Sequence, residues 1–201
     1  MTPRVIIGID EVGRGPIAGP LCVGACLMDL TEAKSEFSVF FGIRDSKKLT
    51  PKAREAWFRL ITSAARAGKC RWRTTFVGEK VIDRRGLSYA LRRAIGSVLR
   101  KLNAHPRNSK VLLDGGIRAP KRFVHQETII KGDEKEPLIA SASIVAKVCR
   151  DRYMARVSKE YPQYGFEYHK GYGTKKHYAA VKRYGMSKIH RRSFLKNFVS
   201  R

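Results

Sequence analysis

Apolar and polar residues alternate in short blocks along most of this chain, and the blocks have the lengths of strands and helices. Short runs rich in Val, Ile, Leu and Phe, bounded by turn-forming residues, predict strands. These runs are residues 4–10, 21–30, 70–77, 110–114 and 122–130. The glycine-rich segment 11–20 joins the first two runs, which indicates a hairpin with a wide connection.

Helices are predicted where apolar residues recur at helical spacing. The segments with this spacing are residues 50–68, 82–102, 137–161 and 174–184. Thr50 suits an N-cap and Pro51 suits a first turn, so the first helix is expected to begin there and to end near Gly68. Its apolar positions are Trp57, Leu60, Ile61 and Ala64.

The order of these elements, with a hairpin first and strand–helix alternation later, indicates one α/β layer fold. We therefore expect a mixed sheet flanked by helices, with a small C-terminal helical extension. Residues 1–160 are expected to form the main domain. Residues 161–201, which are rich in Tyr, Gly, His, Lys and Arg, are expected to form a basic extension packed on it. Residues 31–49 are expected to be mostly loop.

Lys and Arg number 42 in the 201 residues against 17 Asp and Glu, which gives a formal net charge of +25. A hydrophobic fraction of 43% is ordinary for a globular protein, so disorder is excluded as the main state. The charge favours a polyanionic partner, because cations placed near phosphates release condensed counterions. Basic residues are spread over the chain and not gathered on one amphipathic helix, which argues against a membrane surface. Nucleic acid is therefore the leading partner.

The four cysteines, Cys22, Cys26, Cys70 and Cys149, are scattered without CxxC pairs, so neither a zinc site nor a disulfide framework is indicated. We expect them to be small buried hydrophobes. Since a membrane span needs roughly 18 consecutive apolar residues, which the chain lacks, and its basic start runs straight into a strand, we expect a cytoplasmic protein.

Acidic residues are rare, and three of them share one context. Asp10 ends the run VIIGID, Asp114 ends VLLD, and Asp133 follows the run ETII after a short turn, while Glu11 comes directly after Asp10. If neighbouring strands run in the same direction, their ends gather at one edge of the sheet, where open α/β proteins form their sites. The four carboxylates would then meet.

A cluster of acids needs compensation, because like charges a few ångströms apart raise one another's pKa values. Hard divalent cations such as Mg²⁺ and Mn²⁺ provide it, since they prefer oxygen ligands. A single aspartate at a strand end is equally well explained as a turn residue or a helix cap. Three in one context, with a neighbouring glutamate, favour a metal site.

Taken together, the motifs of this chain closely resemble those of one family. This family is ribonuclease HII, also called the type 2 ribonucleases H. The matching segments follow the family's order along nearly the whole chain. They are residues 8–16 (GIDEVGRGP), 45–49 (DSKKL), 113–115 (LDG), 131–133 (KGD), 140–154 (ASASIVAKVCRDRYM), 164–172 (YGFEYHKGY) and 190–194 (HRRSF).

The resemblance implies an RNase H-like fold and an endonuclease that hydrolyses the RNA strand of RNA/DNA hybrids. It also implies cutting 5′ of single ribonucleotides embedded in duplex DNA, which leaves 3′-hydroxyl and 5′-phosphate ends. The catalytic and metal-binding carboxylates that match are Asp10, Glu11, Asp114 and Asp133. They would hold two divalent ions, Mg²⁺ or Mn²⁺, with Asp10 touching both.

Substrate contacts are expected at two places. Discrimination of RNA from DNA needs a contact to the 2′-hydroxyl, and a glycine-rich loop beside the first acids lets backbone groups approach a sugar closely. In the family that the chain resembles, a tyrosine packs on the sugar that follows the ribonucleotide. The resemblance implies that Tyr172 has this role here. The expected sugar-reading loop is Gly13, Arg14 and Gly15; the expected phosphate contacts are Ser46, Lys47, Lys48, Lys170, Arg191 and Arg192.

Other acidic and histidine residues receive structural assignments. Asp151 lies between two arginines on a predicted helix and is expected to be an ion-pair partner. His177 and His190 lack metal-ligand spacing and receive no catalytic role. Glu134 and Glu136 flank the fourth candidate ligand without an assigned function.

Two other functions are compatible with the charge and the acidic residues of this sequence. A nuclease of the same superfamily, such as a junction resolvase, would use similar carboxylates without probing a 2′-hydroxyl. A noncatalytic RNA-binding or ribosome-associated protein would have a comparable charge and cut nothing. The expected partners are RNA/DNA hybrid and ribonucleotide-containing duplex DNA, the expected state is a monomer, and a replication clamp is left open as a partner.

Overall fold

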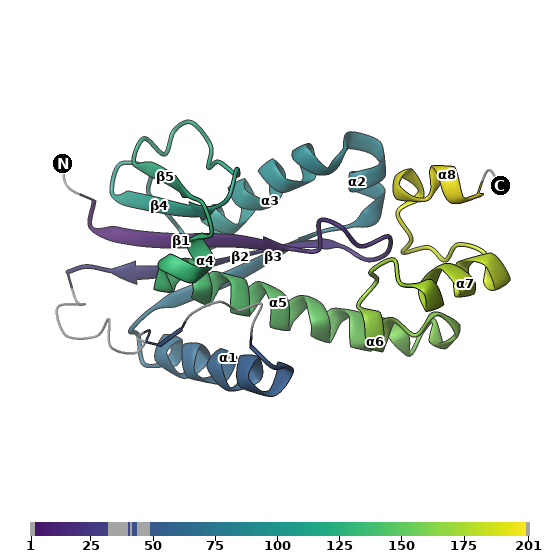
Figure 1. Cartoon of the computed structure of the whole chain (residues 1–201). Coiled ribbons are helices and arrows are strands. Elements are labelled where there is room, and N and C mark those ends of the chain that lie inside the picture. The colour runs from purple at the N-terminus through teal and green to yellow at the C-terminus, as the bar shows by residue number, and fades with distance from the viewer. Residues whose placement is uncertain (1–2, 32–39, 41, 44–48, 200–201) are drawn as a thin grey trace.

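The computed structural model describes residues 3–31, 40, 42–43 and 49–199. Within these residues the chain forms a five-stranded mixed sheet in the order β3-β2-β1-β4-β5 (Figure 1). The strands are β1 (Val5–Val12), β2 (Leu21–Asp29), β3 (Arg71–Val77), β4 (Ser109–Asp114) and β5 (Gln126–Ile129). β1, β2 and β3 pair antiparallel, whereas β4 runs parallel to β1 and β5 runs parallel to β4. The predicted strands and the hairpin are confirmed, although the last strand is shorter than its apolar run.

Helices cover both faces of the sheet (Figure 1). Their bounds are α1 (Pro51–Arg66), α2 (Glu79–Arg85), α3 (Leu87–Lys101), α4 (Gly132–Lys135), α5 (Pro137–Ser158), α6 (Phe166–His169), α7 (Lys175–Tyr184) and α8 (Lys196–Val199), with short 3-10 turns η2 (Pro162–Tyr164) and η3 (Arg192–Phe194). α2 and α3 lie on one face, and α1 and α5 lie on the other. Each face has its own apolar cluster, so the sheet is the middle of three layers. This agrees with the predicted α/β class.

The start of α1 follows its sequence signals. The Oγ1 atom of Thr50 accepts a hydrogen bond from the backbone N–H of Ala53, and Pro51 occupies the first turn. The buried face differs from the expected one: Phe58 and Ile61 are buried, whereas Leu60 is 53% exposed. Helical spacing alone is compatible with several faces, and packing against the sheet selects this one.

The expectation of one helix over residues 82–102 is wrong. The segment forms α2 and α3, which meet at Gly86, where φ is +79°. A residue in this region of φ cannot continue a right-handed helix, and glycine adopts it without a steric penalty. The sequence pattern missed the break because an isolated glycine is also tolerated inside helices.

α5 packs unusually close to the sheet because two glycines leave room for its backbone. A Cβ atom on Gly8 would lie 2.2 Å from the carbonyl carbon of Leu138, and one on Gly24 would lie 2.3 Å from the carbonyl oxygen of Ala142. Gly24 pairs with Asp10 across β1 and β2. The close approach therefore brings α5 directly over the strand position that carries the first candidate acid.

The C-terminal elements pack against the end of α5. Met154 and Val157 of α5 share an apolar cluster with Tyr164, Phe166 and Val181. Figure 1 places α6, α7 and α8 at one end of the molecule, opposite the N-terminus. The expected helical extension is thus present and packed on the sheet layers, while the division at residue 160 stays a prediction.

Two smaller expectations concern the cysteines and the membrane. Cys22, Cys26 and Cys70 are buried free thiols and Cys149 is partly buried, in agreement with their expected role as small hydrophobes. Among the described residues, no helix is long and apolar enough to cross a membrane.

Candidate active site

The parallel strands bring the candidate acids to one edge of the sheet. Ile9 of β1 pairs in register with Leu113 of β4, so the next residues along, Asp10 and Asp114, lie side by side. β5 runs in the same direction, and the chain that leaves it forms α4, which carries Asp133. The strands that lead to the three aspartates therefore share one direction, as the prediction of a common edge requires.

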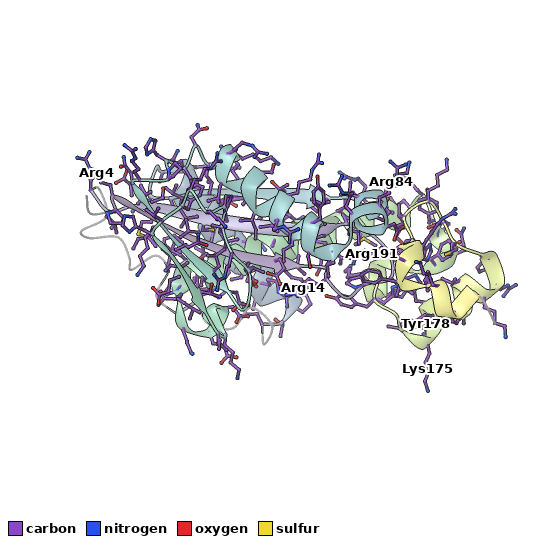
Figure 2. All side chains as sticks on the ribbon, turned by 90° about the horizontal axis from the view of Figure 1, so that it is seen from above. Arg4, Arg14, Arg84, Lys175, Tyr178 and Arg191 are labelled. Atoms are coloured by element: carbon purple, nitrogen blue, oxygen red, sulfur yellow. The ribbon has the colours of Figure 1, made fainter. Side chains whose placement is uncertain are left out.

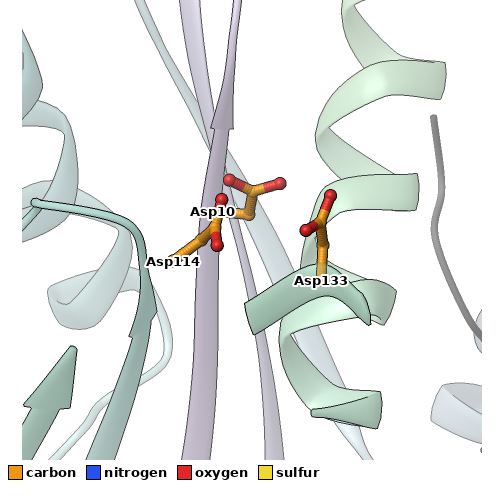
Figure 3. A group of neighbouring side chains, drawn as sticks. All are labelled: Asp10, Asp114 and Asp133. Carbon is orange, nitrogen blue, oxygen red and sulfur yellow. The ribbon is translucent and has the colours of Figure 1, made fainter. Parts of the chain in front are cut away.

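Three carboxylates meet at this edge (Figure 3). Asp10, Asp114 and Asp133 each offer one oxygen atom, and these atoms all lie within 4.8 Å of one another. Asp10 and Asp133 are buried, and Asp114 is partly buried. Among the described residues this group does not include Glu11, so the structure brings together three of the four candidate ligands.

Glu11 lies beside the group and contacts the loop of residues 13–15. Its Oε1 atom lies 3.1 Å from Nη1 of Arg14, whose side chain is 55% exposed. Successive side chains of a strand leave it on alternate sides, so Glu11 and Asp10 do not offer adjacent oxygens although they are neighbours in sequence. The charge of Glu11 is still close enough to raise the pKa of Asp10.

A tight turn positions Asp133. Lys131 has a left-handed backbone with φ of +54°, and the N–H of Gly132 donates to Oδ1 of Asp114 over 2.7 Å. A Cβ atom at Gly132 would lie 2.6 Å from Cδ1 of Ile139. Glycine at this position therefore lets α4 fold back against α5 and carry Asp133 next to Asp114.

The environment of Asp10 is that of a buried carboxyl among other acids. Burial is the main cause that raises its pKa to about 7, and the charges of Glu11 and Asp114 add to the rise. The side chain of Ser143 and the N–H of Glu11, 2.7 Å from Oδ1, oppose it by hydrogen bonding. Several carboxylate oxygens converge here in a strongly basic protein, and this donor set fits a hard divalent cation.

Two buried arginines hold the loop that follows these acids. Arg191 is fully buried, and its guanidinium donates to the carbonyls of Gly13, Arg14 and Gly19 at 2.6, 2.9 and 2.9 Å. The expectation that Arg191 contacts the nucleic acid backbone is therefore corrected, because a fully buried guanidinium cannot reach a phosphate. Its role is to hold the loop.

Arg150 of α5 has the same role, which its sequence pattern does not predict. Its guanidinium donates to the carbonyls of Ala18, Pro20 and Lys170, and a Cβ atom on Gly13 would lie 2.3 Å from its Nε. A buried charge needs several acceptors, and those of Arg150 come from distant segments, so nothing in its local sequence indicates this role.

The remaining candidate contacts are placed as follows. Tyr172 is 40% exposed, and the Cζ of Arg150 lies 5.9 Å from its ring centroid. Lys170 is partly buried and donates to the carbonyl of Glu167, whereas Arg192 is exposed and donates its backbone N–H to Asp83. Ser46, Lys47 and Lys48 lie outside the described residues.

Two acids without a predicted catalytic role, Asp151 and Glu134, each lie near a lysine. Asp151 pairs with Lys147 at 2.8 Å, so it is an ion-pair partner, although not of the arginines beside it. Glu134 is exposed and lies 3.9 Å from the ammonium group of Lys131.

A basic hollow of about 770 Å³ lies beside the loop. Its lining includes Arg14, Arg92, Arg118 and Lys121, together with Gly116, which closely follows Asp114. Figure 2 shows nitrogen-tipped side chains along the length of the molecule, from Arg4 to Lys175. Positive charge is therefore spread over the surface beside the loop, where it attracts phosphates.

Comparison with known proteins adds an independent result. The model of the ribonuclease HII family matches residues 7–197. Ribonuclease HII of Caldicellulosiruptor bescii is 44% identical over 197 residues, which cover 98% of this chain and 89% of that protein.

Solved structures show the same fold. Ribonuclease H2 from Pyrococcus horikoshii superposes with a TM-score of 0.72 at 26% identity, covering 98% of this chain and 100% of that one. The RNase HII in a complex with PCNA from Archaeoglobus fulgidus superposes with a TM-score of 0.73 at 24% identity, covering 93% of each chain. With the family model matched over residues 7–197, the chain belongs to the ribonuclease HII family, metal-dependent hydrolases that cut the RNA strand of RNA/DNA hybrids.

Proposed function

We propose that this enzyme, besides cutting RNA in hybrids, cuts 5′ of single ribonucleotides embedded in duplex DNA and leaves 3′-hydroxyl and 5′-phosphate ends. The observation that carries the proposal is the meeting of Asp10, Asp114 and Asp133 within 4.8 Å, next to a glycine loop that two buried arginines hold in place. The site thus combines a metal-binding donor set with a surface suited to inspecting a sugar.

The three aspartates, with Glu11 as the fourth ligand, are proposed to be the residues that would hold two divalent ions, Mg²⁺ or Mn²⁺. Bound ions would lower the pKa of a water, neutralise charge on the phosphate and stabilise the departing 3′ oxygen. The chain itself keeps the aspartates in place: Gly132 holds Asp114 through its N–H, and the N–H of Glu11 holds Asp10.

The loop of residues 13–15 is proposed to read the 2′-hydroxyl through its backbone amides. In a planar trans peptide the C=O and the following N–H point in opposite directions. Arg191 draws the carbonyls of Gly13 and Arg14 toward itself, so the N–H groups of Arg14 and Gly15 point away from it. A Cβ atom on Gly15 would meet nothing within 4 Å, which supports access of a sugar from that side.

Tyr172 is proposed to pack on the deoxyribose that follows the ribonucleotide. Its neighbour Gly171 accepts hydrogen bonds from the N–H groups of Ile17 and Ala18, at 2.9 and 3.2 Å. The tyrosine is therefore tied to the segment that continues the sugar-reading loop. An exposed aromatic ring at this place provides an apolar surface for a sugar that lacks a 2′-hydroxyl.

The remaining contacts are proposed to position the duplex. Arg192 and Lys170 suit phosphates distant from the cut, while Ser46, Lys47 and Lys48 suit phosphates beside it; such contacts hold register without reading sequence. The protein is proposed to act as a monomer, and a replication clamp stays an open alternative as its partner.

A paired cleavage assay tests the proposal. One duplex carries a single ribonucleotide, and its twin is all DNA; both are incubated with and without Mg²⁺ or Mn²⁺. We expect one cut, 5′ of the ribonucleotide, only with divalent ion, and no cut in the twin. A junction resolvase would treat the two duplexes alike, and a noncatalytic binding protein would cut neither.

A further inference from the structure

A chain of hydrogen bonds runs through the buried C-terminal part of the molecule and ends at the backbone of Tyr172. The backbone N–H of Ser187 donates to Nδ1 of His190 over 2.9 Å, and Nε2 of His190 lies 3.0 Å from Nε2 of His177. Nδ1 of His177 lies 2.8 Å from the carbonyl oxygen of Tyr172. We call these four residues the histidine relay.

The two ends of the relay fix where its protons lie. A backbone N–H only donates, so Nδ1 of His190 accepts and the proton of this ring lies on Nε2. A carbonyl only accepts, so Nδ1 of His177 carries a proton and its Nε2 is left to accept from His190. Both ends therefore predict the same hydrogen-bond direction, from the Nε2–H of His190 to Nε2 of His177. Each ring then carries one proton, and each of its two nitrogens has a hydrogen-bond partner.

The surroundings keep both rings neutral. His177 is fully buried and His190 is 2% exposed, and burial is the main cause that lowers the pKa of each to about 4. The ring of His169 stacks on His177 with centroids 4.2 Å apart. It has its own partners, the carbonyl of Tyr164 and the N–H of Gly171. A second proton on His177 would set its Nε2–H against the Nε2–H of His190 across 3.0 Å. A second proton on His190 would set its Nδ1–H against the backbone N–H of Ser187 across 2.9 Å.

The relay links the two regions proposed to inspect the sugars. One end holds the carbonyl of Tyr172. Near the other end, His190 precedes Arg191 in the chain and pairs with Ala18, and Arg191 holds the carbonyls of the sugar-reading loop. A shift at either histidine would therefore change the distance between that loop and the tyrosine.

We propose that His177 and His190 are positioning residues that hold Tyr172 at a fixed distance from the loop of residues 13–15, so that the enzyme measures the junction between a ribose and the deoxyribose after it. This rests on the proposed junction-sensing role of Tyr172. The histidines act only through the backbone they hold and touch no reacting atom.

The direct test measures the tautomers of the relay rings by long-range ¹⁵N NMR on the full chain at neutral pH. We expect a neutral Nδ1–H tautomer for His177 and a neutral Nε2–H tautomer for His190. The reverse tautomers, or a positive charge on either ring, would overturn the relay. This measurement needs neither substrate nor variant, so its outcome is independent of the proposed activity.

A pair of variants tests the positioning role. His177→Asn places an amide N–H near the position of Nδ1, whereas His177→Phe fills the space without a donor. With His177→Phe we expect the ratio of kcat/KM at a single ribonucleotide to kcat/KM on continuous hybrid to fall about tenfold, the equivalent of one buried hydrogen bond. His177→Asn should keep the ratio within about threefold of wild type, because it keeps the donor to Tyr172 and loses only the acceptor for the Nε2–H of His190. His125→Asn, at an exposed histidine, is the matched control and should leave the ratio unchanged.

The outcomes separate the two proposals. Equal ratios for His177→Asn and His177→Phe would show that the hydrogen bond to Tyr172 does not set discrimination, and the positioning role would be wrong. If His177→Phe fails to fold, the NMR tautomers and the Asn variant still decide. A wild-type enzyme that does not cut at single ribonucleotides would overturn the proposed function while leaving the tautomer assignment intact.

Discussion

Asp10 combines burial, hydrogen bonding and neighbouring negative charge in one side chain. We predict that Asp10→Asn abolishes cleavage and leaves duplex binding largely intact, because the change removes a metal ligand but no phosphate contact. Asp114→Asn and Asp133→Asn should each reduce transition-state stabilisation by at least about 3 kcal/mol. Single-turnover kinetics with a parallel binding assay measure both effects.

Asp151→Asn is the matched control for these variants, since Asp151 pairs with Lys147 outside the site. It should cut at nearly the wild-type rate. Near-wild-type turnover by any of the three site variants would remove that aspartate from the catalytic group.

The raised pKa of Asp10 predicts how the metal-free protein responds to pH. With a folded pKa of about 7 against an ordinary value of 3.8, the folded state binds this proton more tightly than the unfolded state. The contribution of this proton to the free energy of unfolding is therefore fully present below about pH 4. It is lost as the pH rises to 7, at about 1.4 kcal/mol per pH unit. In EDTA, Asp10→Asn should be more stable than wild type at pH 8, with the gain vanishing near pH 4.

Urea unfolding of both proteins at the two pH values measures this difference. Adding Mg²⁺ at pH 8 should stabilise wild type and not the variant, because only wild type binds the ion tightly. A variant that gains equally at both pH values would show that ionised Asp10 does not destabilise the metal-free fold.

Tyr172 and Lys47 are predicted to affect the substrates differently. Tyr172→Ala should lower kcat/KM most at an isolated ribonucleotide, where a deoxyribose follows the RNA sugar, and less on continuous hybrid. Lys47→Ala should weaken binding to all duplexes alike and reduce the salt slope by about one unit, since it removes the phosphate contact proposed for this lysine. If Tyr172→Ala slows cleavage of both substrates equally, the tyrosine has only a structural role.

The strands and α5 show what the sequence could predict and what it could not. Asp10, Asp114 and Asp133 were found because each follows an apolar strand, and parallel strand ends share an edge. The buried roles of Arg150 and Arg191 were not predicted, because an arginine that donates to backbone carbonyls has the same local sequence pattern as a surface arginine. The acceptors come from residues far away in the chain, so only the folded structure shows them.

The close contact between α5 and the hairpin carries a stability prediction. A Cβ atom at Gly24 would lie 2.3 Å from the carbonyl oxygen of Ala142, which is backbone and cannot move aside. Gly24→Ala should therefore destabilise the fold by at least about 2 kcal/mol, and metal affinity should fall with it because Asp10 lies across the strand pair.

Gly78→Ala is the control, because a Cβ atom there meets nothing within 4 Å and no positive φ is required. Its effect should stay within about 0.5 kcal/mol. Equal urea midpoints for Gly24→Ala and Gly78→Ala would mean that α5 can move away from the sheet without loss of stability.

The layered fold, the basic surface and the acidic edge have separate roles. A charge of +25 draws the duplex to the protein without regard to sequence, and the sheet brings three acids to one point within that positive field. The C-terminal elements, tied to the loop by Arg150 and Arg191, add the surface that is proposed to distinguish sugars. Charge alone would fit a noncatalytic binding protein, and the acidic edge is the feature that such a protein would not need.

The most direct measurement is the number of Mn²⁺ ions bound per chain, counted by electron paramagnetic resonance in the presence of a duplex that carries an uncleavable ribonucleotide. We predict about two ions for wild type. We also predict clearly weaker binding for Asp10→Asn, Asp114→Asn and Asp133→Asn, and binding like wild type for Asp151→Asn. The same Mn²⁺ affinity and stoichiometry in wild type and all three site variants would contradict a metal site at this edge of the sheet.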